Sequence, residues 1–260
     1  MTNPMLNPAF IVPSSSCISS VAKSNQFRTH DEKCVEKWNY RRGHIIVVRT
    51  RTQMSMKNGE DWTEGKVLGR DLKQAEHTRV VVMGGGSFGT AMATLFARNG
   101  YKVVILLRNE SLAEEINTQH RNSRFFPQFE LPNSLTASTF PEIVLPQAQL
   151  IVHAIPVQAT RDFLNHNAHH IPPDTPVLCT SKGLEVGELK LMCELLPEIL
   201  GKKRSYAYLS GPSFAKEMMQ QLPTAVVVAS RDSKLQQTLA TMLSSPSFRV
   251  FTSKDVTGLE

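Results

Sequence analysis

The sequence predicts an α/β protein with a Rossmann-like, doubly wound and mostly parallel sheet over residues 78–260. Two observations carry this prediction. Near the start of the region, a glycine-rich turn joins a short β-branched run to a helical pattern. From there to Glu260, strand and helix signals alternate, which is typical of parallel strands linked by crossover helices.

The first unit is a strand, a glycine turn and a helix in that order. Residues 80–83 (VVVM) form an apolar run suited to a strand buried on both faces. Gly84, Gly86 and Gly89 then supply the pattern G-x-G-x-x-G, and residues 90–98 continue with small and apolar side chains at helical spacing. A lone glycine pattern can be a turn that binds nothing, but this order of elements favours dinucleotide binding.

Each glycine has a separate physical role in such a turn. Gly84 permits the tight turn, Gly86 lets the backbone approach a pyrophosphate, and Gly89 lets the helix pack near the strand. The free N–H groups and the dipole of the helix then face the phosphates. Asn99-Gly100 indicates the end of the helix, with Gly100 in a left-handed conformation.

The second predicted strand, residues 101–107, ends at Arg108. An NAD-selective site usually has an Asp or Glu at this place, where it binds the ribose 2′-hydroxyl. Arg108 could instead face a 2′-phosphate or stack on adenine, or it could be a solvated surface residue. NAD is the expected cofactor, and the choice between NAD and NADP stays open.

Further elements follow along the chain. Helix signals are found at residues 111–118, where Ser111 indicates a helix start, and at 157–168, 188–200 and 234–243. Strand signals are found at residues 149–155, 176–181, 206–210, 224–229 and 249–252. Residues 119–132 are irregular, and the rings of Phe125, Phe126 and Phe129 are expected to pack over the sheet edge.

Polar residues follow several of these strands, at the edge where open α/β sheets bind ligands. The turn at Pro156 is one such place. Lys182 comes directly after a buried strand, where it could hold a phosphate or polarise a carbonyl, or could be a surface lysine. Gly211 and Pro212 constrain the next turn, and Ser213 is predicted as a helix N-cap that could bind an anion.

The histidines and cysteines do not indicate a metal site or a disulfide. His153 lies within a predicted strand and is interpreted as a packed core histidine, not a proton shuttle. His166, His169 and His170 are clustered, but no other type of ligand accompanies them. Cys179 and Cys193 show neither metal-ligand spacing nor a paired framework, so we expect reduced, buried thiols.

The first 57 residues have the composition of an organelle transit peptide. They hold nine Lys or Arg and three acids, so the net charge of +6 belongs to them and residues 58–260 are neutral. The first thirty residues are rich in serine and have no Asp or Glu, which is typical of a disordered transit peptide, although a plain tail would look similar. Residues 58–77 are interpreted as a linker. A neutral body argues against nucleic acid as a partner, and no apolar run is long enough to span a membrane.

With these motifs placed, residues 80–260 resemble the NAD(P)-dependent sn-glycerol-3-phosphate dehydrogenases. The motifs that carry the resemblance are GGGSFGTA (84–91), SKGLE (181–185), SGPSFAKE (210–217), LPTAVVVAS (222–230) and DVTGLE (255–260). The resemblance implies hydride transfer between NAD(P)H and dihydroxyacetone phosphate, giving glycerol 3-phosphate for glycerolipid synthesis. It also implies a homodimer in the full-length family. With the leader, the chain looks most like a plant plastid member, the cytosol being the alternative.

The resemblance also implies roles for particular residues. Ser87 and Phe88 would contact the pyrophosphate region of the cofactor, and Arg108 its adenosine end. Lys182 would contact both cofactor and substrate. Gly211 and Ser213 would line the substrate, with Ala215 near the nicotinamide.

The sequence departs from the family pattern at its end. The family's general-acid lysine follows DVTGLE by a few residues, and an all-helical C-terminal domain comes after it. Both are expected to lie beyond Glu260 and to be absent from this chain. The resulting hypothesis is a polypeptide that binds NAD(H) but turns over dihydroxyacetone phosphate negligibly. The alternative is a catalytically inactive nucleotide-binding fragment or regulatory module; a 6-phosphogluconate-like dehydrogenase is disfavoured by SGPSFAKE and SKGLE.

Overall fold

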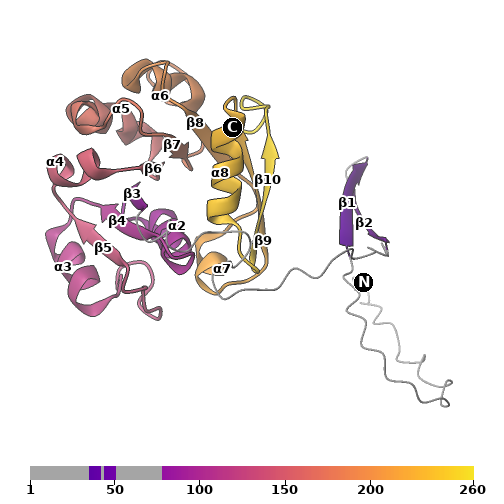
Figure 1. The fold of residues 1–260 in the computed structure, drawn as a ribbon, viewed down its shortest axis with the longest axis horizontal. Coiled ribbons are helices and arrows are strands. Elements are labelled where there is room, and N and C mark those ends of the chain that lie inside the picture. The colour runs from indigo at the N-terminus through magenta and orange to yellow at the C-terminus, as the bar shows by residue number, and fades with distance from the viewer. Residues whose placement is uncertain (1–34, 42–43, 51–77) are drawn as a thin grey trace, which may run out of the picture. The chain divides into compact units, whose positions relative to one another are not determined.

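The computed structural model describes residues 35–41, 44–50 and 78–260 (Figure 1). Two antiparallel strands, β1 (Val35–Arg41) and β2 (His44–Thr50), pair from Val35 with Thr50 to Arg41 with His44. The disorder expected for residues 1–57 does not extend to these strands, and the β-branched run of β2 suits a strand. The predicted linker at 58–77 lies outside the described residues. The transit-peptide assignment stays a prediction.

Residues 78–260 form an eight-stranded sheet with helices on both faces (Figure 1). The strands lie in the order β10-β9-β8-β7-β6-β3-β4-β5. Their bounds are β3 Arg79–Met83, β4 Lys102–Leu106, β5 Leu135–Ser138, β6 Leu150–His153, β7 Val177–Cys179, β8 Tyr206–Ser210, β9 Thr224–Ser230 and β10 Phe248–Ser253. Every neighbouring pair in this sheet is parallel except β8 and β9. The predicted mostly parallel sheet is therefore confirmed.

The two faces of the sheet are covered by different helices. One apolar core includes side chains of α2 (Ser87–Arg98), α3 (Glu110–Gln119), α7 (Ala215–Met219) and α8 (Ser233–Leu243). The other includes side chains of α4 (Pro141–Val144), the 3₁₀ turn at Leu145–Gln147, α5 (Val157–Asn167) and α6 (Met192–Leu200). Along β3, Val80 and Val82 belong to the first core, and Val81 and Met83 to the second. A strand buried on both faces explains why its sequence is continuously apolar.

The order of the strands creates the place where a ligand can bind. From the interior strand β3 the chain passes to β4 and β5 on one side, and then crosses to β6 and β7 on the other. The loops after β3 and β6 therefore diverge at the carboxyl edge of the sheet. Such a topological switch point is where open α/β sheets bind ligands.

Several predicted boundaries are wrong. Helix α3 begins at Glu110, not Ser111, because the side chain of Asn109 accepts a hydrogen bond from the Leu112 N–H at 2.9 Å. Helix α6 begins at Met192, not at residue 188, because Leu189 adopts a φ of 53° and Glu185 pairs with Lys190 in a turn. In the part of the chain that the structure describes, no helix has the length and apolar character to cross a membrane.

Candidate functional site: a cleft at the glycine loop

The glycine loop is packed between β4 and β6. Gly84 has a φ of +113°, which residues other than glycine rarely adopt. Its N–H donates to the Leu106 carbonyl at 2.9 Å. A methyl group at Gly84 would lie 2.5 Å from the Ala154 carbonyl oxygen. The loop therefore lies directly against the turn that follows β6.

The other two glycines of the pattern have opposite environments. A methyl group at Gly89, in the first turn of α2, would lie 2.0 Å from the Gly84 carbonyl oxygen. A methyl group at Gly86 would meet no atom within 4 Å. Gly89 thus allows the helix to pack on the loop, whereas Gly86 borders open space.

The start of α2 is arranged to receive an anion. Gly86 is its N-cap and provides no side chain, and the first turn contains no acidic residue. The first N–H groups of any α-helix have no acceptor within the helix, and the macrodipole places partial positive charge there. A phosphate is the ligand that suits uncapped N–H groups beside a glycine with free space.

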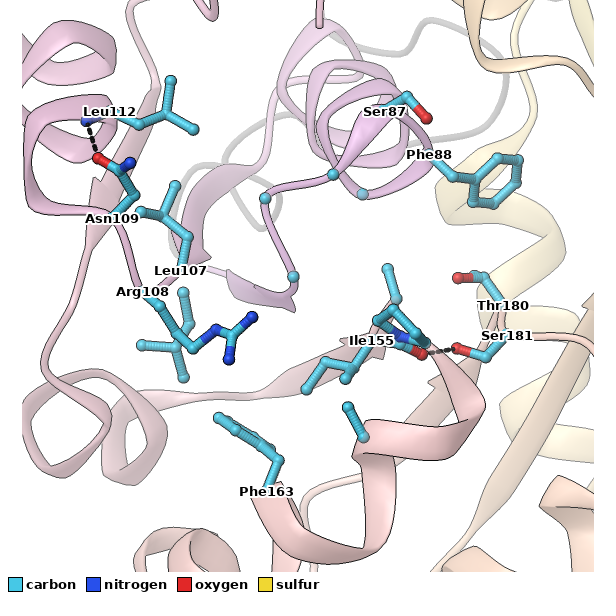
Figure 2. Close-up of a pocket in the computed structure, with 18 of the residues that line it drawn as sticks. Ser87, Phe88, Leu107, Arg108, Asn109, Leu112, Ile155, Phe163, Thr180 and Ser181 are labelled. Atoms are coloured by element: carbon cyan, nitrogen blue, oxygen red, sulfur yellow. Dashed lines mark hydrogen bonds between the residues drawn. The ribbon is translucent and has the colours of Figure 1, made fainter. Parts of the chain in front are cut away.

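This helix start opens into a cleft of about 1040 Å³. Its lining includes the glycine loop, Ser87 and Phe88 of α2, the end of β4, the turn after β6, one face of α5 and the end of β7. Figure 2 shows Phe88 on the side of Thr180 and Ser181, while the guanidinium of Arg108 points into the cleft from the end of β4. Arg108 is exposed, and within residues 78–260 no carboxylate forms an ion pair with it.

Most of the predicted binding residues line this cleft, and three of them do not. The cleft lining contains Gly84, Gly86, Ser87, Phe88, Gly89, Arg108 and Lys182. Gly211, Ser213 and Ala215 are not part of it. Of these three residues Gly211 is linked to the cleft, because the Lys182 ammonium lies 3.5 Å from its carbonyl oxygen.

The prediction that Ser213 is a helix N-cap is wrong. Helix α7 begins two residues later at Ala215, and its N-cap is Phe214, without a side-chain hydrogen bond. The Ser213 N–H donates to the Gly211 carbonyl at 2.8 Å, and its hydroxyl lies 3.4 Å from the same oxygen. Ser213 therefore belongs to a turn that begins at Gly211, which has a φ of +146°, and the helix starts only after this turn.

His153 is buried below the cleft, as predicted. The residue has no exposed surface, and burial lowers the pKa of its imidazole to about 4. The ring nevertheless has polar neighbours, with Nδ1 at 3.0 Å from the Ser181 hydroxyl and Nε2 at 3.1 Å from the Thr160 hydroxyl. It is a neutral hydrogen-bonding residue and not an inert one.

The two cysteines of this domain are free thiols. Cys179 is buried as predicted, whereas Cys193 is only partly buried. Burial raises the pKa of the Cys179 thiol, and burial beside Glu260 raises that of Cys193 to about 12. Both are protonated at neutral pH and therefore poor nucleophiles.

Sequence reasoning missed part of the cleft wall. Phe126 and Phe129 pack into the core, as expected for these rings, and contact each other edge-on at 6.0 Å, but Phe125 is exposed and lines the cleft with Arg124. The face of α5 that includes Asp162 and His166 was not predicted to line it either. No local sequence motif identifies these residues, because only the order of the strands in the sheet brings them to the cleft.

An uncapped helix start, a packed glycine loop and a cleft at the switch point of a doubly wound sheet define a dinucleotide-binding domain. Residues 79–236 match the family model described as NAD-dependent glycerol-3-phosphate dehydrogenase N-terminus. The chain belongs to this family of oxidoreductases, whose N-terminal domain is an NAD-binding Rossmann domain.

Individual relatives agree with the family match. The chain is 44% identical over 189 residues to a chloroplastic glycerol-3-phosphate dehydrogenase [NAD(+)] of Arabidopsis thaliana, covering 71% of this chain and 45% of that protein. It is 41% identical over 187 residues to a glycerol-3-phosphate dehydrogenase [NAD(P)+] of Desulfovibrio desulfuricans, covering 72% and 56%.

A crystal structure of the glycerol-3-phosphate dehydrogenase of Coxiella burnetii superposes with a TM-score of 0.65 at 30% identity, covering 69% of this chain and 55% of that one. The chain therefore spans about half the length of the relatives it matches.

Proposed function

We propose that residues 78–260 bind NAD(H) in the cleft, with the pyrophosphate on the N-terminus of α2. The observation that carries the proposal is the contrast between the glycines. Gly84 and Gly89 are closed by backbone contacts, while Gly86 alone borders open space beside uncapped N–H groups. In this arrangement Ser87 and Phe88 contact the pyrophosphate region and Arg108 the adenosine end.

Arg108 makes NADP(H) a possible second cofactor. Its guanidinium stands where an NAD-selective site has a carboxylate, and a guanidinium can pair with a 2′-phosphate through two hydrogen bonds. The names of the relatives include both NAD(+) and NAD(P)+ enzymes. Arg108 is the residue at which this choice can be tested.

The substrate of the proposed enzyme is dihydroxyacetone phosphate, bound on the Lys182 side of the cleft. Lys182 would hold an anionic or carbonyl oxygen there, Gly211 and Ser213 would line the substrate, and Ala215 would lie near the nicotinamide. When bound, the nicotinamide would supply a hydride to the carbonyl carbon, and the oxygen would take a proton from a general acid to give sn-glycerol 3-phosphate for glycerolipid synthesis. The 3.5 Å approach of the Lys182 ammonium to the Gly211 carbonyl supports placing these groups in one site.

Binding and turnover are tested separately on the 260-residue chain. NADH is titrated while its fluorescence is followed, and NADH oxidation is then measured with dihydroxyacetone phosphate. Saturable NADH binding supports the cofactor site, and its absence would refute the proposal. Turnover would refute the alternative of an inactive nucleotide-binding module and also the expectation that this polypeptide alone reacts negligibly.

We also propose a plastid location, with residues 1–57 as the transit peptide, and a homodimer. The composition of residues 1–57 and the chloroplastic names of plant relatives support the plastid location. A fluorescent protein fused after residue 57 should enter plastids of plant cells, and retention in the cytosol would contradict it. The homodimer is the one that the resemblance implies for the full-length family, so sedimentation equilibrium of this chain, with a monomer mass of 29.0 kDa, tests whether it dimerises on its own.

A further inference from the structure

His153 connects three segments of the cleft wall through its two ring nitrogens. It lies at the end of β6 and is fully buried. Nδ1 lies 3.0 Å from the hydroxyl of Ser181, at the end of β7, and Nε2 lies 3.1 Å from the hydroxyl of Thr160 on α5. Nothing in the proposed function uses this residue.

The hydrogen bonds determine which nitrogen carries the proton. The Ser181 hydroxyl donates to the Ile155 carbonyl at 2.6 Å, a bond drawn in Figure 2. Each hydroxyl has one proton and the neutral ring has one N–H, so only one of the two hydroxyls can donate to its carbonyl and accept from the imidazole. The Ser181–Ile155 bond at 2.6 Å is much shorter than the 3.2 Å between the Thr160 hydroxyl and the Pro156 carbonyl, so Ser181 accepts from Nδ1–H and Thr160 donates to Nε2.

Hydrogen bonds from α5 also hold residues 184–186, which follow Lys182 in the chain. Gln158 donates to the Leu184 carbonyl at 2.8 Å and accepts from the Val186 N–H at 3.1 Å. Arg161 donates to the buried carboxylate of Glu185 at 2.6 Å. Lys182 is therefore held from both sides, by Ser181 before it and by the residues bound to α5 after it.

We propose that His153 is a positioning residue that, as the Nδ1–H tautomer, holds Ser181 against the Ile155–Pro156 turn and thereby places Lys182 at the cleft. Lys182 is exposed and has one weak polar contact with the residues that the structure describes, so its location depends on the backbone that carries it. The effect of His153 on NADH affinity rests on the proposed function, whereas the tautomer of His153 does not.

The tautomer is tested without any ligand. The chain is labelled with ¹⁵N-histidine, and long-range ¹H–¹⁵N correlations are recorded at pH 7, with His153 assigned by its loss in His153→Phe. The expected pattern is a protonated Nδ1 and an unprotonated Nε2. A protonated Nε2, alone or together with Nδ1, would overturn the assignment.

Action through Lys182 is tested by a double-mutant cycle on NADH affinity. His153→Phe removes both ring hydrogen bonds but leaves each hydroxyl a carbonyl acceptor, Ile155 or Pro156, so the fold should persist. We expect His153→Phe to weaken NADH binding about tenfold in the wild-type background and to have no further effect in Lys182→Ala. Equal effects in both backgrounds would show a merely structural role and overturn the proposal, as would an unchanged affinity in Lys182→Ala.

Ser181→Ala provides a second route to the same answer. It removes the hydroxyl that links His153 to the loop while keeping the ring in place, so its effect should also vanish in Lys182→Ala. If His153→Phe lowers the melting temperature, Ser181→Ala decides between a positioning role and a merely structural one. Failure of the wild-type chain to bind NADH would instead refute the proposed function, and the ligand-free spectrum would still decide the tautomer.

Discussion

Two glycine-to-alanine substitutions in one loop should have opposite consequences. Gly89→Ala places a methyl group 2.0 Å from the Gly84 carbonyl oxygen, a backbone atom that no side-chain rotation can move. Gly86→Ala places the same group in open space, at a φ of −74° that any residue adopts. Gly89→Ala should destabilise the fold, whereas Gly86→Ala should weaken only the binding of the pyrophosphate.

The magnitudes follow from these contacts. Real Cβ atoms essentially never approach closer than 3.0 Å, so the Gly89→Ala backbone must move by about 1 Å. Overpacking that cannot relax into side chains costs about 3 kcal/mol, the upper end of the usual range. In a domain of this size that loss lowers the melting temperature by roughly 6–12 °C. For Gly86→Ala, a poorer N-cap and a less flexible unfolded chain offset each other, so the free energy of unfolding changes by less than about 1 kcal/mol.

Two measurements on the same samples separate the effects. Thermal unfolding by circular dichroism should show the lower melting temperature of Gly89→Ala and a nearly unchanged transition for Gly86→Ala. NADH titration of Gly86→Ala should show binding at least about tenfold weaker, which corresponds to about 1.4 kcal/mol. A Gly86→Ala protein that is stable and binds NADH normally would refute the placement of the pyrophosphate, and an unaltered melting temperature of Gly89→Ala would refute the packing argument.

Three further substitutions test other contacts. Asn99→Ala should reduce the free energy of unfolding by about 1–3 kcal/mol in urea titrations, because the buried Asn99 amide donates to two carbonyls at the end of α8, at 2.9 and 3.2 Å. Arg161 lowers the pKa of Glu185, so this carboxylate stabilises the fold above its unfolded pKa of about 4.3, and the stabilisation is lost as pH falls through the lower folded pKa. Glu185→Gln should therefore lose less stability on acidification than the wild type or the exposed control Glu114→Gln. Arg108→Ala should weaken NADPH binding more than NADH binding, and equal effects would argue against a contact with a 2′-phosphate.

The fold class was predictable because its signals are local. A β-branched run, three glycines and a helix start lie within a short stretch, and each depends on its immediate neighbours. Strand β5 was missed because it has four residues with a polar and partly exposed pattern, LTAS. The reversal of β9 was not predictable either, since residues 224–229 indicate a strand but not its direction. Between β8 and β9 the only helix is the five-residue α7, which is shorter than crossovers between parallel strands usually are.

The site was only partly predictable, because its residues meet through the register of the sheet. One row of paired residues crosses five strands: Leu106, Met83, His153, Cys179 and Tyr208. The groups assigned to the site follow this row by a few residues on each strand. Lys182 and Gly211 both stand three residues past their paired strand residues, which explains why the ammonium reaches the Gly211 carbonyl.

His153 is itself a member of that row, and this explains how it can act on Lys182 from inside the core. It pairs with Met83 on one side and Cys179 on the other, so its backbone lies between the strand before the glycine loop and the strand before Lys182. A shift of one residue between β6 and β7 would move Ser181 away from Nδ1 and would turn the side chains of β7 to the opposite face. The hydrogen bond from the imidazole to Ser181 is therefore both a consequence of the register and an interaction that stabilises it.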